Sequence, residues 1–262
     1  MLARALRHTE KNSISVDDDA LEYYEHSSQA GSVFAALRNY REISKILSTY
    51  ICGLSEFCDE NGIIHCDFNQ TGTATGRLSS SNPNLQNIPA RKSSQIRAAF
   101  KPRGKGKILV SCDLSQIEMR IYAWYSRDAN LYKAYMDNPD VDLHQATADI
   151  LGIDRKHAKQ INFARLYGAG AAKLASNLGI SVEKAKQFID LYDRRIPSIR
   201  ALNKMLDNRI RQLGYIRNIV GRRYYFSEPS YLALNYLIQG SAADFFKQNC
   251  IVRVDEFLTE NY

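Results

Sequence analysis

The chain has 262 residues, of which 45% are hydrophobic, and a formal net charge of +7 at pH 7. No apolar run approaches the roughly 18 residues that span a bilayer, and no secretory signal begins the chain, so we expect a soluble, cytoplasmic protein. The five cysteines are irregularly spaced and fit neither a disulfide framework nor a zinc site, which predicts reduced core thiols.

Charge is distributed unevenly along the chain. Residues 1–31 hold three Lys/Arg and six Asp/Glu, whereas residues 32–262 carry a net charge of +10. A basic body is typical of nucleic-acid-binding proteins, although a generic basic protein would have the same balance. Residues 1–31 form an acidic, polar lead-in that we leave unassigned.

The first elements in chain order are a helix, a strand and a loop. Apolar positions at helical spacing predict a helix over residues 32–50, with Arg41 and Lys45 on its other faces. Residues 63–69 are predicted to form a strand, and the glycines and prolines of residues 72–89 predict an irregular polar loop. Such loops are usually connections, and a basic helix face is usually solvated.

Residues 107–112 form an apolar, partly β-branched run that predicts a buried strand ending at Asp113. A carboxylate at a strand end either caps the following helix or is available to a metal ion. The residues around Asp113 alone do not decide between these two roles.

Residues 155–168 contain two cations and two aromatic side chains at intervals of four. On a helix, Arg155, Lys159, Phe163 and Tyr167 would form one stripe roughly 18 Å long, with charge at one end and flat rings at the other. This order suits a nucleoside triphosphate, phosphates first and base last. The alternative is an amphipathic surface helix with its rings in the core and its cations in solvent.

The last third of the chain is predicted to be mainly helical. Helical patterns cover residues 181–213 with Gly214 as C-cap, then residues 219–226 suggest a hairpin with its turn at residues 221–223, and residues 231–239 are helical again. Asn235 and Gln239 share one helix face, where they could simply be a buried amide pair.

Four segments, residues 73–89, 113–120, 155–168 and 239–244, together closely resemble the DNA polymerase I family, also called family A, in the family's order. The resemblance extends from about Tyr40 to the end of the chain. It implies an α+β fold: a palm with an antiparallel sheet that is incomplete here, a mostly helical fingers subdomain and the end of a thumb helix. The expected divisions are 1–31 unassigned, 32–70 thumb-to-palm connection, 71–144 palm, 145–230 fingers and 231–262 a helix returning to the palm.

The resemblance implies a DNA-directed DNA polymerase that uses two Mg²⁺ ions and deoxynucleoside triphosphates in replication or repair. By position, Asp113 would be a catalytic metal ligand and Lys159 a catalytic proton donor that, with Arg155, binds the phosphates. The residues that would line the rest of the nucleotide site are Gln116, Glu118, His144, Phe163 and Tyr167. Glu118 would lie beneath the sugar and exclude a 2′-hydroxyl, although His144 could equally be a capping or core histidine.

The same resemblance implies primer-template DNA as the macromolecular partner. By position, the residues that would contact it are Arg41, Lys45, Arg77, Asn84, Gln86, Asn235 and Gln239. The last two would reach the minor groove at the primer terminus, where hydrogen-bond acceptors occupy equivalent positions in every base pair.

The chain also departs from the family. The His-Asp-Glu segment that carries the family's second catalytic aspartate is missing, and Asp255 and Glu256 lie within a helical pattern that does not replace it. Three explanations are open: the chain is a fragment, it is one part of a split enzyme that a second polypeptide completes, or it is an inactive DNA-binding module. The compact form would suit a virus as well as a bacterium. Smaller departures are Leu114 for the usual Tyr and Ala164 for the usual Gly, and nothing resembles a proofreading exonuclease.

Overall fold

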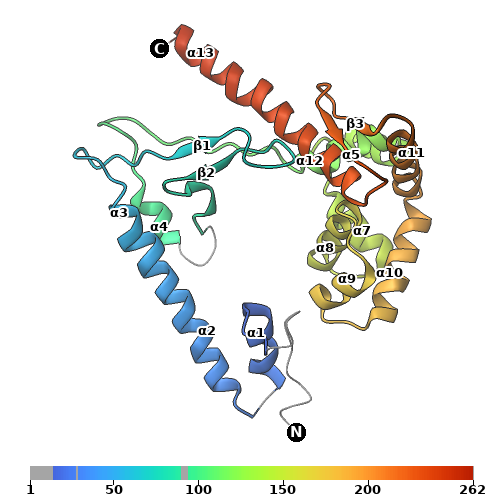
Figure 1. The fold of residues 1–262 in the computed structure, drawn as a ribbon, viewed down its shortest axis with the longest axis horizontal. Helices are drawn as coiled ribbons and strands as arrows, with labels where there is room; N and C mark the ends of the chain where they lie inside the picture. The colour runs from blue at the N-terminus through green and yellow to red at the C-terminus, as the bar shows by residue number, and fades with distance from the viewer. Residues whose placement is uncertain (1–13, 28, 90–93, 262) are drawn as a thin grey trace. The chain divides into compact units, whose positions relative to one another are not determined.

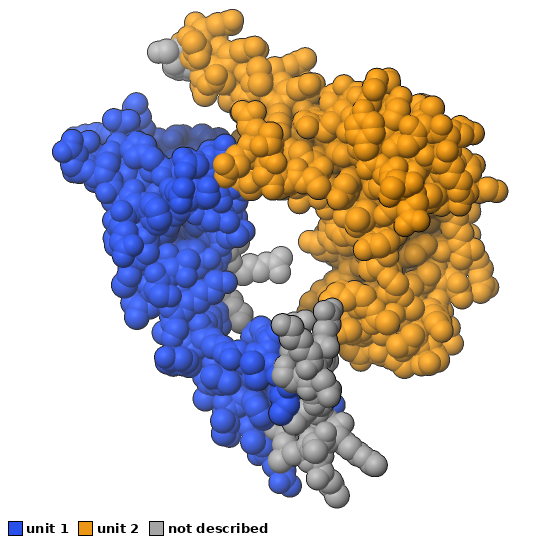
Figure 2. Space-filling view, in the orientation of Figure 1, with its two compact units in different colours: residues 1–68, 80–110 blue, residues 69–79, 111–262 orange. Residues whose placement is uncertain are grey.

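The computed structural model describes residues 14–27, 29–89 and 94–261. The chain divides into two compact units, residues 1–68 with 80–110 (unit 1) and residues 69–79 with 111–262 (unit 2), which Figures 1 and 2 show. Helices predominate and the only sheets in the described ranges are two-stranded, so the predicted α+β class is confirmed.

Unit 1 is built around a long helix. The predicted helix over residues 32–50 is confirmed as α2 (Gly31–Lys45), which continues into a π-helical segment (Ile46–Cys52) and α3 (Gly53–Ser55). The acidic lead-in contains a helix of its own, α1 (Asp18–Ser27), which packs on α2 through a small core that includes Leu21 and Tyr24.

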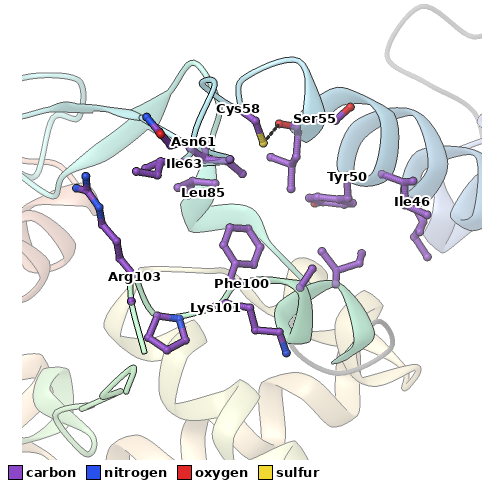
Figure 3. A pocket seen from close by; sticks show the side chains of 18 residues that line it. Ile46, Tyr50, Ser55, Cys58, Asn61, Ile63, Leu85, Phe100, Lys101 and Arg103 are labelled. Atoms are coloured by element: carbon purple, nitrogen blue, oxygen red, sulfur yellow. Dashed lines mark hydrogen bonds between the residues drawn. The ribbon is translucent and has the colours of Figure 1, made fainter. Parts of the chain in front are cut away.

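The rest of unit 1 contains short elements. Strands β1 (Asp67–Asn69) and β2 (Ser79–Ser81) pair in a two-stranded sheet, so the strand predicted for residues 63–69 is confirmed only at its end. A 3-10 turn (Leu85–Asn87) and α4 (Ser94–Ala99) follow. Figure 3 shows a pocket of about 1270 Å³ in this unit, with the ring of Phe100 directed toward Leu85.

The prediction of a buried strand over residues 107–112 is wrong. The segment has no regular secondary structure, and Ile108, Leu109 and Val110 are 79%, 64% and 76% exposed. A strand needs a neighbour that pairs with its backbone N–H and C=O groups, and no described strand pairs with this one. The apolar side chains of this run are therefore exposed, although their composition is typical of a buried strand.

The prediction of core thiols is also wrong. All five cysteines are free, but Cys52, Cys58 and Cys112 are exposed and Cys66 and Cys250 are only partly buried. The sequence excluded disulfides from spacing, and spacing carries no information about burial.

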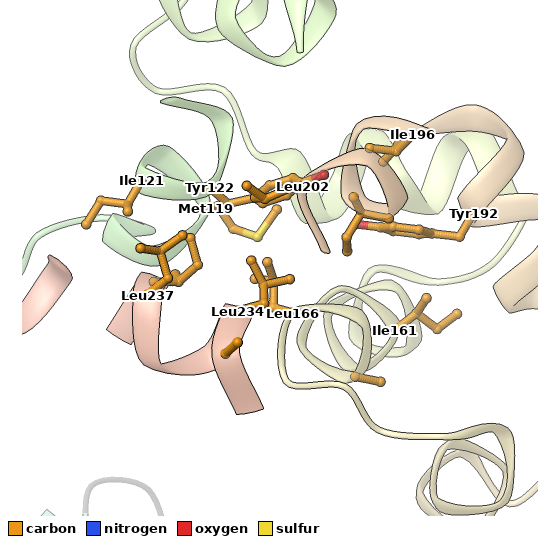
Figure 4. Close-up of a cluster of buried hydrophobic side chains, with 14 of the residues drawn as sticks. Met119, Ile121, Tyr122, Ile161, Leu166, Tyr192, Ile196, Leu202, Leu234 and Leu237 are labelled. Carbon is orange, nitrogen blue, oxygen red and sulfur yellow. The ribbon is translucent and has the colours of Figure 1, made fainter. Parts of the chain in front are cut away.

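Unit 2 is a helical body. Its helices are α5 (Ile117–Ser126), α6 (Ala129–Asp137), α7 (Leu143–Leu151), α8 (Arg155–Leu166), α9 (Ala171–Leu178), α10 (Val182–Arg195), α11 (Ser198–Leu213), α12 (Leu232–Phe246) and α13 (Arg253–Asn261). Helices α5, α8, α10, α11 and α12 meet in one core, in which Tyr122, Leu166, Tyr192 and Leu234 are almost completely buried (Figure 4). This core fixes the elements that carry the functional side chains.

Helix ends in unit 2 follow the local sequence. Asp154 and Ser181 cap α8 and α10 by accepting backbone N–H groups, and Gly214 ends α11 in the left-handed conformation with φ of 71°. The helices predicted over residues 181–213 and the cap at Gly214 are confirmed.

The predicted hairpin exists, but its first strand begins earlier. Strands β3 (Tyr215–Arg217) and β4 (Arg223–Tyr225) pair antiparallel, with Tyr215 opposite Tyr225. The β-branched Ile219 and Val220 belong to the turn because the Asn218 side chain accepts the N–H groups of Val220 and Arg222, at 3.2 and 2.9 Å.

Helix α12 continues through a π-helical segment (Lys247–Val252) into α13, as Figure 1 shows. Asp255 and Glu256 therefore lie in a helix, as predicted, and not in a hairpin. Within the described ranges, no helix combines the length and the apolar character that crossing a lipid bilayer requires.

Candidate functional site

The stripe of Arg155, Lys159, Phe163 and Tyr167 forms along α8 and its C-cap, as the spacing predicts. The rings of Phe163 and Tyr167 are stacked, with centroids 5.5 Å apart and planes 7° from parallel, and Lys159 Nζ lies 5.6 Å from the Phe163 centroid. The surface therefore runs from a cation to two stacked rings. Lys159 is exposed, and its ammonium is in no described ion pair.

Arg155, at the start of the stripe, is already paired. Its Nε lies 2.6 Å from Oδ2 of Asp142, which also caps α7 by accepting the N–H groups of His144 and Gln145. Burial raises the pKa of Asp142, but Arg155 and these amides together lower it by more, so that the pKa lies below its ordinary value. Asp142 is thus an ionised competitor for Arg155.

His144 is a buried side chain beside the stripe. Its Nδ1 lies 2.9 Å from Asn162 Nδ2 and its ring centroid lies 5.5 Å from that of Phe163. Burial lowers the pKa of His144, and Arg155 and Lys159 lower it further against an opposing effect of Asp142. The imidazole is therefore neutral at pH 7 and supports the face of Phe163.

Glu118 is the point where three segments of unit 2 meet. Its carboxylate is buried near the start of α5, where one oxygen accepts a hydrogen bond from Arg77 and the other from the Tyr167 hydroxyl. Burial raises the pKa of Tyr167 well above its ordinary value, and the hydrogen bond to the Glu118 carboxylate raises it further. The structure thus brings together three residues that the sequence placed in separate motifs.

The loop before Arg77 is held by side chains that the sequence did not single out. Lys247 Nζ donates to the carbonyl of Gly76 at 2.6 Å, and the Tyr224 hydroxyl donates to that of Thr75 at 2.9 Å. These bonds fix the backbone from which Arg77 reaches Glu118. The sequence signal was weak, since a lysine on a helix is usually solvated.

A buried carboxylate organises the same region. Asp244 accepts two hydrogen bonds from Arg222, both at 2.7 Å, and one from Asn218 at 2.7 Å. Arg222 in turn covers Gly76, where an added Cβ would lie 3.2 Å from its guanidinium carbon. Asp244 belongs to a motif that the sequence identified, but its partners were not predictable.

The predicted metal ligand Asp113 lies in an irregular, exposed segment before α5. An exposed carboxylate provides the oxygen ligands that Mg²⁺ prefers. Among the described residues, however, no three His, Cys, Asp or Glu side chains gather as metal ligands would. Asp113 can therefore supply one ligand of a metal site, and the described residues do not bring further ligands beside it.

Gln116 precedes α5 in a left-handed conformation with φ of 52°. Its amide nitrogen donates to the carbonyl of Val141 at 3.2 Å, and its Oε1 is buried without a partner among the described residues. A buried acceptor without a donor is costly, which is consistent with a ligand group completing it.

Asn235 and Gln239 lie on one face of α12, as predicted. Gln239 lies close enough to the Tyr167 side chain to lower the pKa of that hydroxyl, and Oδ1 of Asn235 is buried without a described partner. This face of α12 therefore borders the aromatic end of the stripe.

The remaining predicted residues lie in unit 1. Arg41 donates to the carbonyl of Val16, Lys45 is exposed on α2, and Asn84 accepts from Ser80 Oγ at 2.9 Å. The Gln86 side chain is exposed. Arg41 is thus engaged by the lead-in segment, which the sequence did not predict.

Several known proteins are similar to this chain in sequence. Residues 2–262 match the profile of DNA polymerase family A. DNA polymerase I of Streptococcus pneumoniae serotype 4 is 36% identical over 94% of this chain, and the thermostable DNA polymerase I of Thermus aquaticus is 39% identical over 84%. The chain spans about 30% of the length of these curated relatives.

A solved structure is similar to this one. It is the POL domain of Pol1 from M. smegmatis in complex with DNA primer-template and dNTP, with a TM-score of 0.84 and 33% identity over 97% of this chain and 48% of that chain. The fold is therefore that of a polymerase domain. More narrowly, the chain belongs to DNA polymerase family A.

Proposed function

We propose that the chain contributes to template-directed DNA synthesis, in which a primer 3′-hydroxyl attacks the α-phosphorus of a deoxynucleoside triphosphate and pyrophosphate leaves. The observation that carries this proposal is the continuous surface from Lys159 over Phe163 and Tyr167 to the Glu118 carboxylate. It offers a cation for phosphates, ring faces for a base and a carboxylate for a sugar.

Each of these residues has a proposed role. Arg155 and Lys159 bind the β- and γ-phosphates, and Lys159 donates a proton to the departing pyrophosphate. Glu118 fills the space of a 2′-hydroxyl, so that ribose is rejected by steric conflict. Gln116 and His144 complete the nucleotide site, His144 by supporting Phe163.

Mg²⁺ would lower the pKa of the primer hydroxyl and neutralise charge on the phosphates. Asp113 is the residue of this chain that would hold it. Its exposed position leaves the carboxylate accessible to triphosphate oxygens and to a second carboxylate.

Primer-template DNA is the proposed macromolecular ligand, through the positions that match the family's DNA contacts. Arg41, Lys45, Asn84 and Gln86 would bind strands from unit 1. In unit 2, Arg77 would help to hold primer and template, and Asn235 and Gln239 would reach the minor groove at the primer terminus. The DNA in the M. smegmatis complex supports this assignment for the fold.

We also propose that a polypeptide segment bearing His-Asp-Glu, in a longer form of this protein or in a second chain, completes the site. Two apolar surfaces support it. Ile251, in the π-helical segment, is 42% exposed, and Phe257 and Leu258, on α13, are 57% and 50% exposed. The run Ile108 to Val110, in unit 1, is exposed and unpaired among the described strands, and a partner strand would satisfy its backbone.

The competing function is a DNA-binding module without catalysis. The observation in its favour is that no group of three potential metal ligands forms among the described residues. The stripe on α8 favours the polymerase reaction, because a protein that only binds DNA does not need a triphosphate surface.

Primer extension distinguishes the two functions. The chain and its Asp113→Ala variant would each be assayed with Mg²⁺ and all four deoxynucleoside triphosphates, alone and with an added segment bearing His-Asp-Glu. We expect the chain to extend the primer when the segment bearing His-Asp-Glu is added, and the Asp113→Ala variant not to extend it. Absence of extension under both conditions, with primer-template binding intact, would leave the DNA-binding module as the function.

A further inference from the structure

Residues 101–107, here called the basic loop, carry a cation at every second position. Lys101, Arg103, Lys105 and Lys107 alternate with a proline and two glycines, so the loop has a charge of +4 and no acidic residue. Small or cyclic neighbours cannot shield these charges. The proposed polymerase reaction does not use the loop.

The structure exposes all four cations. The loop has no helix or strand, and none of its cations is in an ion pair within the described parts of the chain. Gly104 and Gly106 have φ of 100° and 81°, a region that favours glycine, and the N–H of Lys107 closes a turn on the carbonyl of Gly104 at 3.4 Å. The alternating glycines thus permit a tight, exposed and strongly charged turn.

The surroundings do not neutralise this charge. Lys101 and Arg103 line the pocket of unit 1, whose other walls are mostly apolar side chains, including Tyr50 and Phe100, and contain no carboxylate (Figure 3). An ordinary solvated surface intersperses both signs of charge, because like charges placed close together repel. Four unopposed cations on a short loop therefore indicate an anionic partner.

We propose that the basic loop is a binding surface for the phosphate backbone of nucleic acid, additional to the primer-template contacts proposed above. Arginine and lysine on an exposed, glycine-rich loop can contact a phosphate chain without reading its sequence. The proposal rests on the proposed function only in taking DNA as the ligand, and it requires no catalysis.

The salt dependence of DNA binding tests the surface. Fluorescence anisotropy would measure binding of a labelled primer-template duplex, without Mg²⁺, across a series of salt concentrations. The test variant replaces Lys101, Arg103, Lys105 and Lys107 by glutamine. The control replaces four exposed cations of α10 and α11 in the same way: Lys184, Lys186, Arg194 and Lys204.

Neutralising the four cations of the basic loop is expected to make the slope of log K against log salt shallower by about 3.6, since each phosphate contact contributes about 0.9. The control variant is expected to keep the wild-type slope. Thermal unfolding of all three proteins checks that the loop variant is folded, which its exposed positions favour. Equal slopes for the loop variant and the wild type would overturn the proposal.

Two further results separate the alternatives. If poly-glutamate displaces DNA from the wild type as effectively as unlabelled DNA of equal charge, the surface is one for acidic proteins and the assignment to nucleic acid is wrong. If the slopes differ as expected but primer extension fails, the binding surface stands and only the proposed reaction falls. Failure of the wild type to bind DNA at any salt concentration would overturn the surface.

Discussion

The guanidinium of Arg155 lies 2.6 Å from the carboxylate of Asp142, so one of the two cations proposed to bind phosphates is occupied before any nucleotide arrives. Both side chains are partly exposed, at 50% and 34%. Exchange of this carboxylate for a triphosphate therefore replaces one ion pair by another and requires little energy.

Replacing Asp142 with asparagine is expected to strengthen binding of a deoxynucleoside triphosphate by a factor of about 1.4 to 5, because an exposed ion pair is worth about 0.2–1 kcal/mol. Asparagine caps a helix as well as aspartate does, so α7 should be unaffected. Equilibrium titration of the primer-template complex with nucleotide measures the change. Asp142→Ala is the control that also loses the cap, and weaker binding by Asp142→Asn would contradict the competition.

Replacing Glu118 with alanine in an active assembly is expected to relax discrimination against ribonucleotides by about tenfold or more, because a cavity replaces the carboxylate beneath the sugar. The ratio of kcat/KM for the two sugars is the measurement. Glu118→Gln keeps the volume and should keep most of the discrimination. Equal ratios for wild type and Glu118→Ala would remove Glu118 from sugar selection.

The buried ion pair between Arg165 on α8 and Asp193 on α10 is expected to be important for stability. Arg165 donates to both oxygens of Asp193, at 3.0 and 2.8 Å, and the Asp193 side chain is only 2% exposed. Arg165→Met would leave this carboxylate with Arg200, which donates at 2.8 Å from a largely exposed position. We expect a loss of about 3 kcal/mol in the free energy of unfolding.

Urea unfolding of three variants checks this pair. Arg200→Met is the matched control and should cost less than about 1 kcal/mol, as exposed pairs do. Replacing both Arg165 and Asp193 by leucine should recover much of the loss, since no buried charge is then left unpaired and Arg200 is largely exposed. A single Arg165→Met variant as stable as the wild type would show that Arg200 alone satisfies Asp193.

Gly240 on α12 permits a close approach to the loop that carries Arg77. A Cβ at this position would lie 1.9 Å from the Tyr224 hydroxyl oxygen and 2.9 Å from the Thr75 carbonyl oxygen. Gly240→Ala is therefore expected to lower the free energy of unfolding by about 1–3 kcal/mol. Gly170→Ala, where nothing lies within 4 Å, is the control for thermal unfolding and should be nearly neutral; equal effects would argue against the close packing.

Several features were determined by the sequence alone, because they depend on spacing along one segment. The stripe on α8, the cap at Ser181 and the end of α11 at Gly214 follow from helical periodicity and from the conformations that serine and glycine favour. The family motifs likewise belong to single segments, which is why they identified the fold.

Other features were decided only by tertiary structure, because they join residues far apart in the chain. Arg77 and Tyr167 meet at Glu118, and Lys247 holds the carbonyl of Gly76, through packing that no local pattern reports. The run at residues 108–110 shows the converse: its composition favours a strand, but a strand forms only where a neighbour pairs with its backbone. Local spacing thus determined which side chains share a face, and packing decided which faces meet.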